Sequence, residues 1–256
     1  MATAREQGRP IAFITGATRG IGYEIAKTLA DDHHLIIGGS SDTAVEVAKE
    51  FPSAEAFVAD LDDIESLQHA VEKLELDRLD VLVHCAGVVS HLPVTETTHA
   101  QWQHAFNVNF FAVAELTRLM VPALTEVPAA TPAVMPAATP AATTGSGTLP
   151  AVVSINSGAG FHSSVGYGPY ASTKFALRAY TDALREEYRG KLRVISIHPG
   201  KTHSDMQREI QDLRGNAYER SEFVDPASIA QAVRFALDTP QDAMVENLTI
   251  RPINGK

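Results

Sequence analysis

The chain has 256 residues, a formal net charge of −10 and one cysteine, and 45% of its residues are hydrophobic. This length suits one sizeable α/β domain and is short for two. The negative charge argues against a general nucleic-acid binder, because phosphate contacts need clustered lysine and arginine, and it gives no reason to expect an anionic membrane surface as partner.

Other features of the composition indicate a cytoplasmic protein without a metal. A single cysteine cannot form an internal disulfide, which fits a reducing compartment. No run of about eighteen apolar residues is present, so no membrane span is predicted. The first predicted strand begins near residue 10, which leaves no room for a signal peptide. The ten histidines show no metal-ligand spacing with cysteine or carboxylates, and no metal site is predicted.

Short apolar runs alternate with helix-like segments along the chain. This pattern predicts a parallel sheet with helices on both faces. The predicted strands are residues 10–15, 33–39, 54–59, 79–84, 150–156, 191–197 and 246–251. Two long helices are predicted at 99–121 and 169–188.

Glycines follow the first predicted strand in the pattern Gly16-x-x-x-Gly20-x-Gly22, and a helical segment covers 23–30. Glycines let the backbone turn tightly and let a pyrophosphate approach, while the N-terminus of a helix offers free N–H groups to phosphates. A strand, a glycine-rich turn and a helix form the context that a dinucleotide site requires. From the turn alone, a strand-to-helix connection without a ligand is an equal alternative.

The composition changes sharply from Pro122 to Pro150, where the unit Pro-Ala-Ala-Thr-Pro occurs at 128–132 and again at 136–140. Prolines block helix and ladder hydrogen bonds, so residues 122–150 are predicted to be an insertion loop with polyproline character. The segment joins a helix to the fifth strand, which puts it at the edge of the sheet opposite the ligand edge. It is either an inert surface insertion or a docking or oligomer-modulating loop.

Tyr170 and Lys174 are four residues apart, and Ser157 stands at the end of the apolar run 151–156. On a helix, that spacing puts the phenol and the ammonium on one face. A nearby ammonium lowers the pKa of a phenol, which a tyrosine needs in order to exchange a proton at neutral pH. A helix-surface pair without function is the alternative. Tyr167 is not part of such a pair, because Ala171 stands where its lysine would have to be.

Together, Thr15-Gly16-x-x-x-Gly20-Ile21-Gly22 with Ser157, Tyr170 and Lys174 resembles the short-chain dehydrogenase/reductase family, and the resemblance extends from about Pro10 to Ile253. It implies a single Rossmann-fold domain over 1–256. The implied sheet is doubly wound, seven-stranded and parallel, with strand order 3-2-1-4-5-6-7. Further markers fall in the family's order, namely Asp60-Leu61, His84-Cys85-Ala86-Gly87, Asn109 and Pro199-Gly200.

Two positions depart from the family pattern. Cys85 replaces an asparagine that helps to hold the central sheet in the family, so the polar bridging there must differ. Ser204 stands where the family often has a threonine that reaches the nicotinamide amide. The serine keeps a hydroxyl at that position.

The resemblance implies four catalytic residues. Tyr170 would be the acid/base, and Ser157 would hydrogen-bond the carbonyl oxygen of the substrate. Lys174 would lower the pKa of the phenol and hold the nicotinamide ribose, and Asn109 would position a water that links Lys174 to solvent. The implied cofactor contacts are Gly16, Thr18, Arg19, Gly20, Ile21, Gly22, Ser40, Ser41, Asp60, Leu61, Cys85, Ala86, Gly87, Tyr170, Lys174, Pro199, Gly200, Thr202 and Ser204.

The sequence gives some information on whether the cofactor is NADP(H) or NAD(H). Enzymes that use NAD often place an acid after the second strand, yet residues 36–41 contain none. Arg19 stands where NADP-preferring members carry a basic residue, and a guanidinium can bind a 2′-phosphate. We therefore expect NADP(H) rather than NAD(H). The alternative is that Arg19 is a solvated loop charge.

Residues 201–225 are the predicted substrate lid. Its basic residues favour a polar or anionic substrate or, equally, a solvated amphipathic helix. We expect an NADP(H)-dependent oxidoreductase that interconverts a carbonyl and a secondary alcohol on a small molecule. The alternatives are a 3-oxoacyl carrier-protein reductase and a non-catalytic NADP(H)-binding regulator. The resemblance also implies a homodimer or homotetramer through the two long helices, with Phe110, Phe111, Phe175 and Leu184 either at the contact or facing the sheet.

Overall fold

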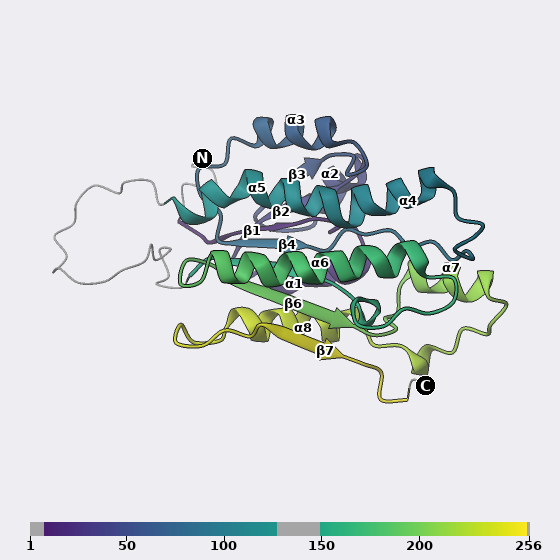
Figure 1. Ribbon diagram of the computed structural model, residues 1–256. Helices are drawn as coiled ribbons and strands as arrows, with labels where there is room; N and C mark the ends of the chain where they lie inside the picture. Colours follow the sequence, from purple (N-terminus) through teal and green to yellow (C-terminus); the bar gives the residue numbers. More distant parts are fainter. Residues whose placement is uncertain (1–7, 127–148, 255–256) are drawn as a thin grey trace, which may run out of the picture.

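The computed structural model describes residues 8–126 and 149–254, and within them the chain forms a seven-stranded parallel sheet covered by helices on both faces (Figure 1). The strand order is β3-β2-β1-β4-β5-β6-β7, which confirms the predicted order. The strands are β1 Ile11–Ile14, β2 His34–Gly39, β3 Ala54–Val58, β4 Val81–His84, β5 Ala151–Ile155, β6 Arg193–Pro199 and β7 Asn247–Ile250.

Eight α-helices are assigned in the described part of the chain. They are α1 Gly20–Leu29, α2 Thr43–Ala48, α3 Ile64–Leu74, α4 His99–Phe106, α5 Ala112–Thr125, α6 Gly168–Glu187, α7 Asp205–Leu213 and α8 Pro226–Leu237. Helix α1 begins at Gly20, three residues earlier than predicted, so two of the three glycines form its first turn. Close packing of this turn on the sheet outweighs the low helix propensity of glycine.

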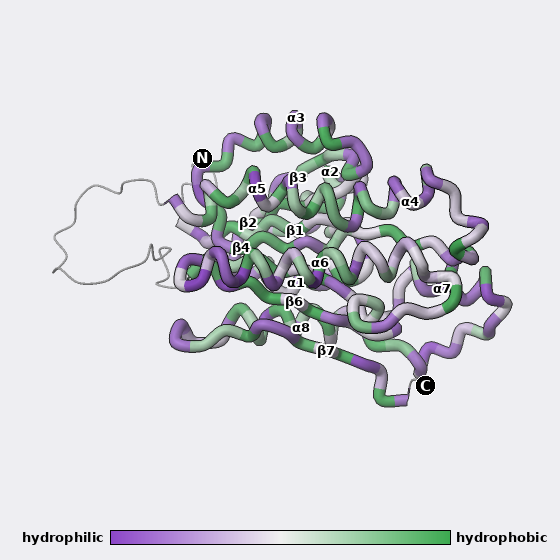
Figure 2. The backbone as a smooth tube through the Cα atoms, viewed as in Figure 1, coloured by the Kyte–Doolittle hydropathy of each residue, from purple (hydrophilic) through white to green (hydrophobic). Residues whose placement is uncertain are grey.

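Two hydrophobic layers hold the helices on the sheet. Ile25 of α1 and Ile229 of α8 pack with one face of the central strands. Leu67 of α3, Leu116 of α5 and Leu184 of α6 pack with the other face. Figure 2 shows hydrophobic residues concentrated along the central strands, whereas hydrophobic and hydrophilic residues alternate along α3. Because β1, β4 and β5 are buried throughout, their carboxyl ends form a firm edge on which a site can be built.

Helices α4 and α5 are joined by a π-helical turn, η2 Asn107–Phe111, so that 99–125 is one helical path. By length and composition alone, this path is long and apolar enough to cross a membrane, although no purely apolar run is present. In the fold, Leu116 and Met120 of this path pack in the core against the sheet. Burial in the domain therefore accounts for part of its apolar character.

The predicted start of the insertion at Pro122 is wrong. Helix α5 continues through Pro122 to Thr125, and Leu124 is buried in the core. Pro122 lies on the exposed side of α5, where water can hydrate the carbonyl that the missing N–H leaves unpaired. Residues 127–148 of the predicted insertion lie outside the described residues. The flanking Thr125 and Ala151 lie at the amino-terminal edge of β5, as expected.

The four apolar residues proposed for the oligomer contact divide into two groups. Leu184 is 6% exposed and belongs to the core, so it faces the sheet. Phe111 and Phe175 are 50% and 43% exposed, and Phe110 is half-buried. Only the phenylalanines are therefore placed where a second copy of the chain could contact them.

Candidate active site

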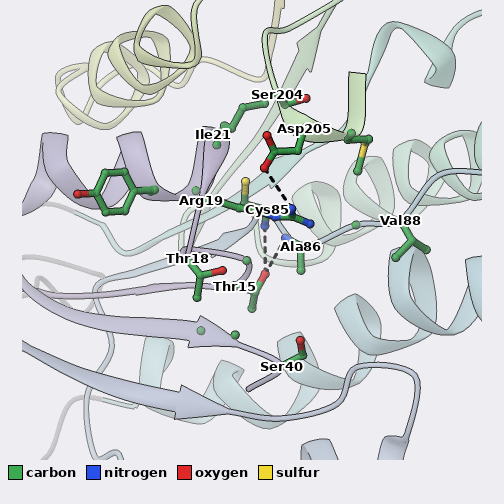
Figure 3. A pocket seen from close by; sticks show the side chains of 18 of the residues that line it. Thr15, Thr18, Arg19, Ile21, Ser40, Cys85, Ala86, Val88, Ser204 and Asp205 are labelled. Atoms are coloured by element: carbon green, nitrogen blue, oxygen red, sulfur yellow. Dashed lines mark hydrogen bonds and ion pairs between the residues drawn. The ribbon is translucent and has the colours of Figure 1, made fainter. Parts of the chain in front are cut away.

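A pocket of about 710 Å³ opens at the carboxyl ends of β1, β2 and β4 (Figure 3). Most of the residues predicted to contact the cofactor line it. They are Gly16, Thr18, Arg19, Gly20, Ile21, Gly22, Ser40, Asp60, Leu61, Cys85, Ala86, Gly87 and Ser204. The predicted contacts that do not line it are Ser41, Tyr170, Lys174, Pro199, Gly200 and Thr202.

The glycine turn has the geometry of a phosphate cradle. Gly16 has φ +64, and a Cβ added there would lie 2.7 Å from Ala86 Cα, so only glycine fits. No side chain caps the N-terminus of α1, and no acidic residue lies in its first turn. The N–H groups of that turn are therefore available to an anion, and the partial positive charge of the helix end is not neutralised locally. These features fit the pyrophosphate of a dinucleotide.

The hydroxyl of Thr15, and not the side chain of Cys85, supplies the polar bridge between the end of β1 and the segment after β4. Its Oγ1 accepts hydrogen bonds from the backbone N–H groups of Cys85 at 3.1 Å and Ala86 at 3.2 Å, as the dashed lines in Figure 3 show. The same hydroxyl donates to the carbonyl of Val83 at 3.4 Å. Burial raises the pKa of the Cys85 thiol to about 12, so the thiol is neutral at physiological pH. The join between β1 and β4 thus does not need the side chain at position 85.

Ser157, Tyr170 and Lys174 come together beside this pocket. Ser157 follows β5, while Tyr170 and Lys174 lie one turn apart near the start of α6. The Ser157 side chain acts on the Tyr170 phenol to lower its pKa, and Lys174 Nζ is 5.7 Å from the centroid of the Tyr170 ring. Lys174 is 4% exposed, and its Nζ donates to the Ile155 carbonyl at 3.0 Å. The three polar groups therefore meet at the ligand edge of the sheet.

The pKa values of this cluster differ from the sequence-based expectation. Burial raises the pKa of Tyr170 and outweighs the hydrogen bond with Ser157, which acts to lower it. The Lys174 ammonium donates to the Ile155 carbonyl, and any lowering of the phenol's pKa by its charge is smaller than the rise caused by burial. Burial lowers the pKa of Lys174 itself to about 8. Lys174 is thus the group of this pair that can change its protonation state near neutral pH.

Asn109 lies in the π-helical turn and is 1% exposed. Its Oδ1 accepts from the N–H of Val88 at 2.8 Å, and its Nδ2 donates to the Val88 carbonyl at 2.9 Å and to Thr173 Oγ1 at 3.1 Å. The side chain therefore ties the segment after β4 to α6. Because both polar atoms of its amide are engaged, a water at this position would have to be held by the backbone of Asn109 rather than by its side chain.

The remaining predicted contacts lie around the rim. Pro199 ends β6, Gly200 follows it, and Thr202 Oγ1 donates to the Gly200 carbonyl at 3.1 Å. Ser204 caps α7, since its Oγ accepts from the N–H of Gln207 at 3.2 Å. Ser41 donates to Thr43 Oγ1 at 3.2 Å and points away from the pocket wall that Ser40 forms.

The predicted lid contributes residues that cross the pocket mouth. Arg19 of the glycine turn makes an ion pair with Asp205 at the start of α7, 3.2 Å apart, and both side chains are well exposed. The dashed line between Arg19 and Asp205 in Figure 3 marks this pair. Because exposed ion pairs contribute little stability, the guanidinium can exchange Asp205 for another anion at low cost.

The sequence profile of the short chain dehydrogenase family matches residues 10–214. The chain belongs to this family. It is therefore an oxidoreductase by membership of the short chain dehydrogenases, and the resemblance stated from the glycine turn and the Ser-Tyr-Lys set is confirmed at the level of the family.

Two curated relatives and one solved structure illustrate the range of similar proteins. Glycine betaine reductase ATRR of Emericella nidulans is 28% identical over 94% of this chain, which spans only 18% of that protein. Benzil reductase ((S)-benzoin forming) of Saccharomyces cerevisiae is 27% identical, covering 80% of this chain and 76% of its own length. The structure of a putative NAD(P)-dependent gluconate 5-dehydrogenase from Beutenbergia cavernae with bound NADP has a TM-score of 0.78 at 27% identity, covering 95% of each chain.

Several residues that shape this short chain dehydrogenase site were not singled out from the sequence. His104, from α4, and Met206, from α7, line the pocket although they lie far apart along the chain. Asn156 and His198 hold the backbone of Ser157 through their side chains. The only sequence signal for the last two was their position directly before Ser157 and before Pro199-Gly200.

Proposed function

We propose that the protein interconverts a carbonyl and a secondary alcohol on a small molecule, with NADP(H) as cofactor. The observation that carries the proposal is the meeting of Ser157, Tyr170 and Lys174 beside the pocket of the glycine turn. A nicotinamide cofactor, when bound, supplies or accepts the hydride. The protein's own residues then have to orient the carbonyl and move one proton.

Tyr170 is the proposed acid/base. In the direction of reduction, its hydroxyl donates a proton to the carbonyl oxygen as that oxygen becomes an alkoxide. The Ser157 hydroxyl donates a hydrogen bond to the same oxygen and stabilises the developing charge. The raised pKa of Tyr170 keeps the phenol protonated, which suits a proton donor.

Lys174 is proposed to hold the cofactor ribose and to resupply the proton. Its pKa of about 8 lets the ammonium release a proton near neutral pH at little cost. Lys174 Nζ is also 4.0 Å from the Cβ that a residue at Gly87 would carry, and Gly87 lines the pocket, so the ammonium lies just behind the pocket wall. These observations support a proton path that runs from Lys174 through Tyr170.

The preference for NADP(H) rests on Arg19 and Ser40. Both line the pocket at the end where β2 finishes, and no acidic side chain from residues 36–41 lines it. A 2′-phosphate would offer Arg19 a doubly charged partner in place of the single carboxylate of Asp205. The phosphate therefore has a binding partner in this chain, whereas a free 2′-hydroxyl has no carboxylate in that segment to bind it.

The decisive experiment is titration of the purified protein with NADPH and NADH, followed by a panel of ketones, aldehydes and 3-oxoacyl esters monitored by nicotinamide absorbance. We expect tighter binding of NADPH and turnover of at least one carbonyl compound. Turnover confined to 3-oxoacyl esters would favour a 3-oxoacyl carrier-protein reductase. Tight binding without turnover across the panel would favour a regulator, and no binding of either cofactor would refute the proposal.

A further inference from the structure

Buried side chains hold the peptide groups on both sides of Ser157. Asn156 Oδ1 accepts a hydrogen bond from the N–H of Ser157 at 2.9 Å, and His198 Nδ1 lies 3.1 Å from the Ser157 carbonyl oxygen. Asn156 is 4% exposed and His198 is 0% exposed. The orientation of Ser157 is therefore set by a neighbouring side chain and by a long-range contact with His198, as well as by its own dihedral angles.

The contact with Ser157 determines which nitrogen of His198 carries the proton. A carbonyl oxygen can only accept, so Nδ1 must be the protonated nitrogen. Burial lowers the pKa of His198, and the neutral ring then has an unprotonated Nε2. Nε2 accepts from the Ser196 hydroxyl at 3.0 Å. Asn247 Oδ1 lies 3.3 Å from Nε2, and this amide must be turned by 180° so that its NH₂ group faces Nε2, because amide oxygen and nitrogen are assigned from such networks.

The surroundings of His198 keep it neutral and fixed. The Phe161 ring packs against the imidazole with centroids 4.3 Å apart. The Arg178 guanidinium lies 4.6 Å from the centroid of the same Phe161 ring. Arg178 and Lys174 both act to lower the pKa of His198 further, while the bond with the Ser157 carbonyl acts to raise it. Nothing in this arrangement brings His198 into direct contact with the Tyr170 hydroxyl or the glycine-turn pocket.

The Ser157 hydroxyl responds to any rotation of this peptide. Ser157 is the N-cap of the short 3-10 turn Gly158–Gly160, and its Oγ accepts from the N–H of Ala159 at 3.1 Å. Its hydroxyl hydrogen is thereby left to donate outward. On the other side, Asn156 Nδ2 donates to the Lys174 carbonyl at 3.2 Å, so the same clamp joins the end of β5 to α6.

We propose that His198 is a positioning residue that fixes the Ser157 peptide, and through it the Ser157 hydroxyl, relative to Tyr170. The inference rests on the proposed function, because it concerns the same proton-transfer site. Loss of the imidazole donor would leave the buried Ser157 carbonyl unpaired and let the peptide rotate toward another donor. A misplacement of about 1 Å at a reacting group costs on the order of 100-fold in rate.

The kinetic test compares His198→Leu, which removes the donor, with His198→Asn, whose amide NH₂ can reach the place of Nδ1–H. We expect His198→Leu to lower kcat about 10- to 100-fold and His198→Asn to stay within about threefold of the parent. The Kd for NADPH should change less than about twofold in both, since His198 does not line the cofactor pocket. Equal losses in the two variants, or no loss in His198→Leu, would overturn the inference.

A double-mutant cycle separates positioning from a general loss of structure. In a Ser157→Ala background, His198→Leu should lower the residual kcat by less than about threefold, because its effect passes through Ser157. An undiminished effect in that background would count against the proposal. His34→Leu is the matched control: His34 is 6% exposed, has two side-chain partners and lies at the opposite edge of the sheet. It should lower thermal stability and leave kcat unchanged.

A second measurement does not depend on turnover. Nitrogen-15 NMR of histidine-labelled protein at pH 7 should show His198 with a protonated Nδ1 and an unprotonated Nε2. The opposite tautomer, or an imidazolium, would overturn the inference whatever the enzyme does. Failure of the proposed function would instead appear as full activity in Tyr170→Phe, so the two failures are distinguishable.

Discussion

Replacing Lys174 by methionine should stabilise the cofactor-free protein while abolishing its activity. Lys174 is 4% exposed, and burial lowers its pKa from 10.5 to about 8. Each pKa unit corresponds to about 1.4 kcal/mol, so the buried ammonium destabilises the fold by ~3 kcal/mol at pH 7. Methionine has a similar length and no charge. The variant therefore gains ~3 kcal/mol in free energy of unfolding from loss of the charge, and loss of the hydrogen bond to the Ile155 carbonyl offsets ~1 kcal/mol of this gain.

The net gain at pH 7 is then ~2 kcal/mol, or a rise of ~4–8 °C in Tm for a chain of this size. The gain must depend on pH. Between pH 8 and 10.5 the unfolded wild-type chain still binds the lysine proton while the folded protein has released it, so wild-type stability rises with pH relative to the variant. The advantage of Lys174→Met should therefore disappear as the pH approaches 10.5.

Urea unfolding of both proteins at pH 7, 9 and 10, without cofactor, measures this difference. Lys191→Met, at an exposed lysine just beyond the same helix, is the control and should show no pH-dependent gain. If Lys174→Met were less stable than wild type at pH 7, or if its gain stayed constant up to pH 10, burial would not govern the energetics of this ammonium.

Three further predictions concern the proposed site. Tyr170→Phe should lower kcat at least ~10³-fold, measured by single-turnover absorbance, and should leave the Kd for NADPH unchanged, measured by fluorescence titration. Activity comparable to that of the parent protein would show that Tyr170 is not the acid/base. Arg19→Ala should raise the Kd for NADPH about 10-fold and leave the Kd for NADH within about twofold of the parent value. Asp205→Asn should lower the Kd for NADPH, because it removes the carboxylate that competes for Arg19. An unchanged preference for NADPH over NADH in Arg19→Ala would refute this account. Gly16→Ala should abolish binding of both cofactors, since its Cβ would meet Ala86 at 2.7 Å; calorimetry that showed normal binding would contradict the cradle.

The strands could be predicted closely because each is a short buried run. All seven begin and end within two residues of the ranges expected from the sequence. Local propensity misled the prediction at two helix ends. Gly20 starts α1 and Pro122 continues α5, although both residues disfavour helices in isolation. In each case, packing of the helix on the sheet, through Ile25 of α1 and Leu124 of α5, stabilises the helix by more than the low helix propensity of the glycine or proline destabilises it.

The electrostatics of the site could not be predicted from spacing. The four-residue separation of Tyr170 and Lys174 correctly indicates that both side chains lie on one face of α6, but it carries no information on burial. Desolvation acts on both groups, raising the pKa of the phenol and lowering that of the ammonium. The sequence pattern predicts only the Coulomb interaction between the two groups. In the folded protein, burial has the larger effect on both pKa values.

Polar groups buried between the sheet and α6 hold the residues of the proposed site in place. Asn156 and His198 hold Ser157, Thr173 holds Asn109, and Lys174 is held by the Ile155 carbonyl. Except for the contact between the neighbours Asn156 and Ser157, these contacts join residues at least 19 positions apart in sequence, so they are not visible as a local motif. Buried polar groups that are fully bonded are rigid, whereas the same groups left unpaired are costly. A site built this way tolerates little displacement, which is why substitutions one step removed from Tyr170, such as His198→Leu, should act on kcat rather than on cofactor affinity.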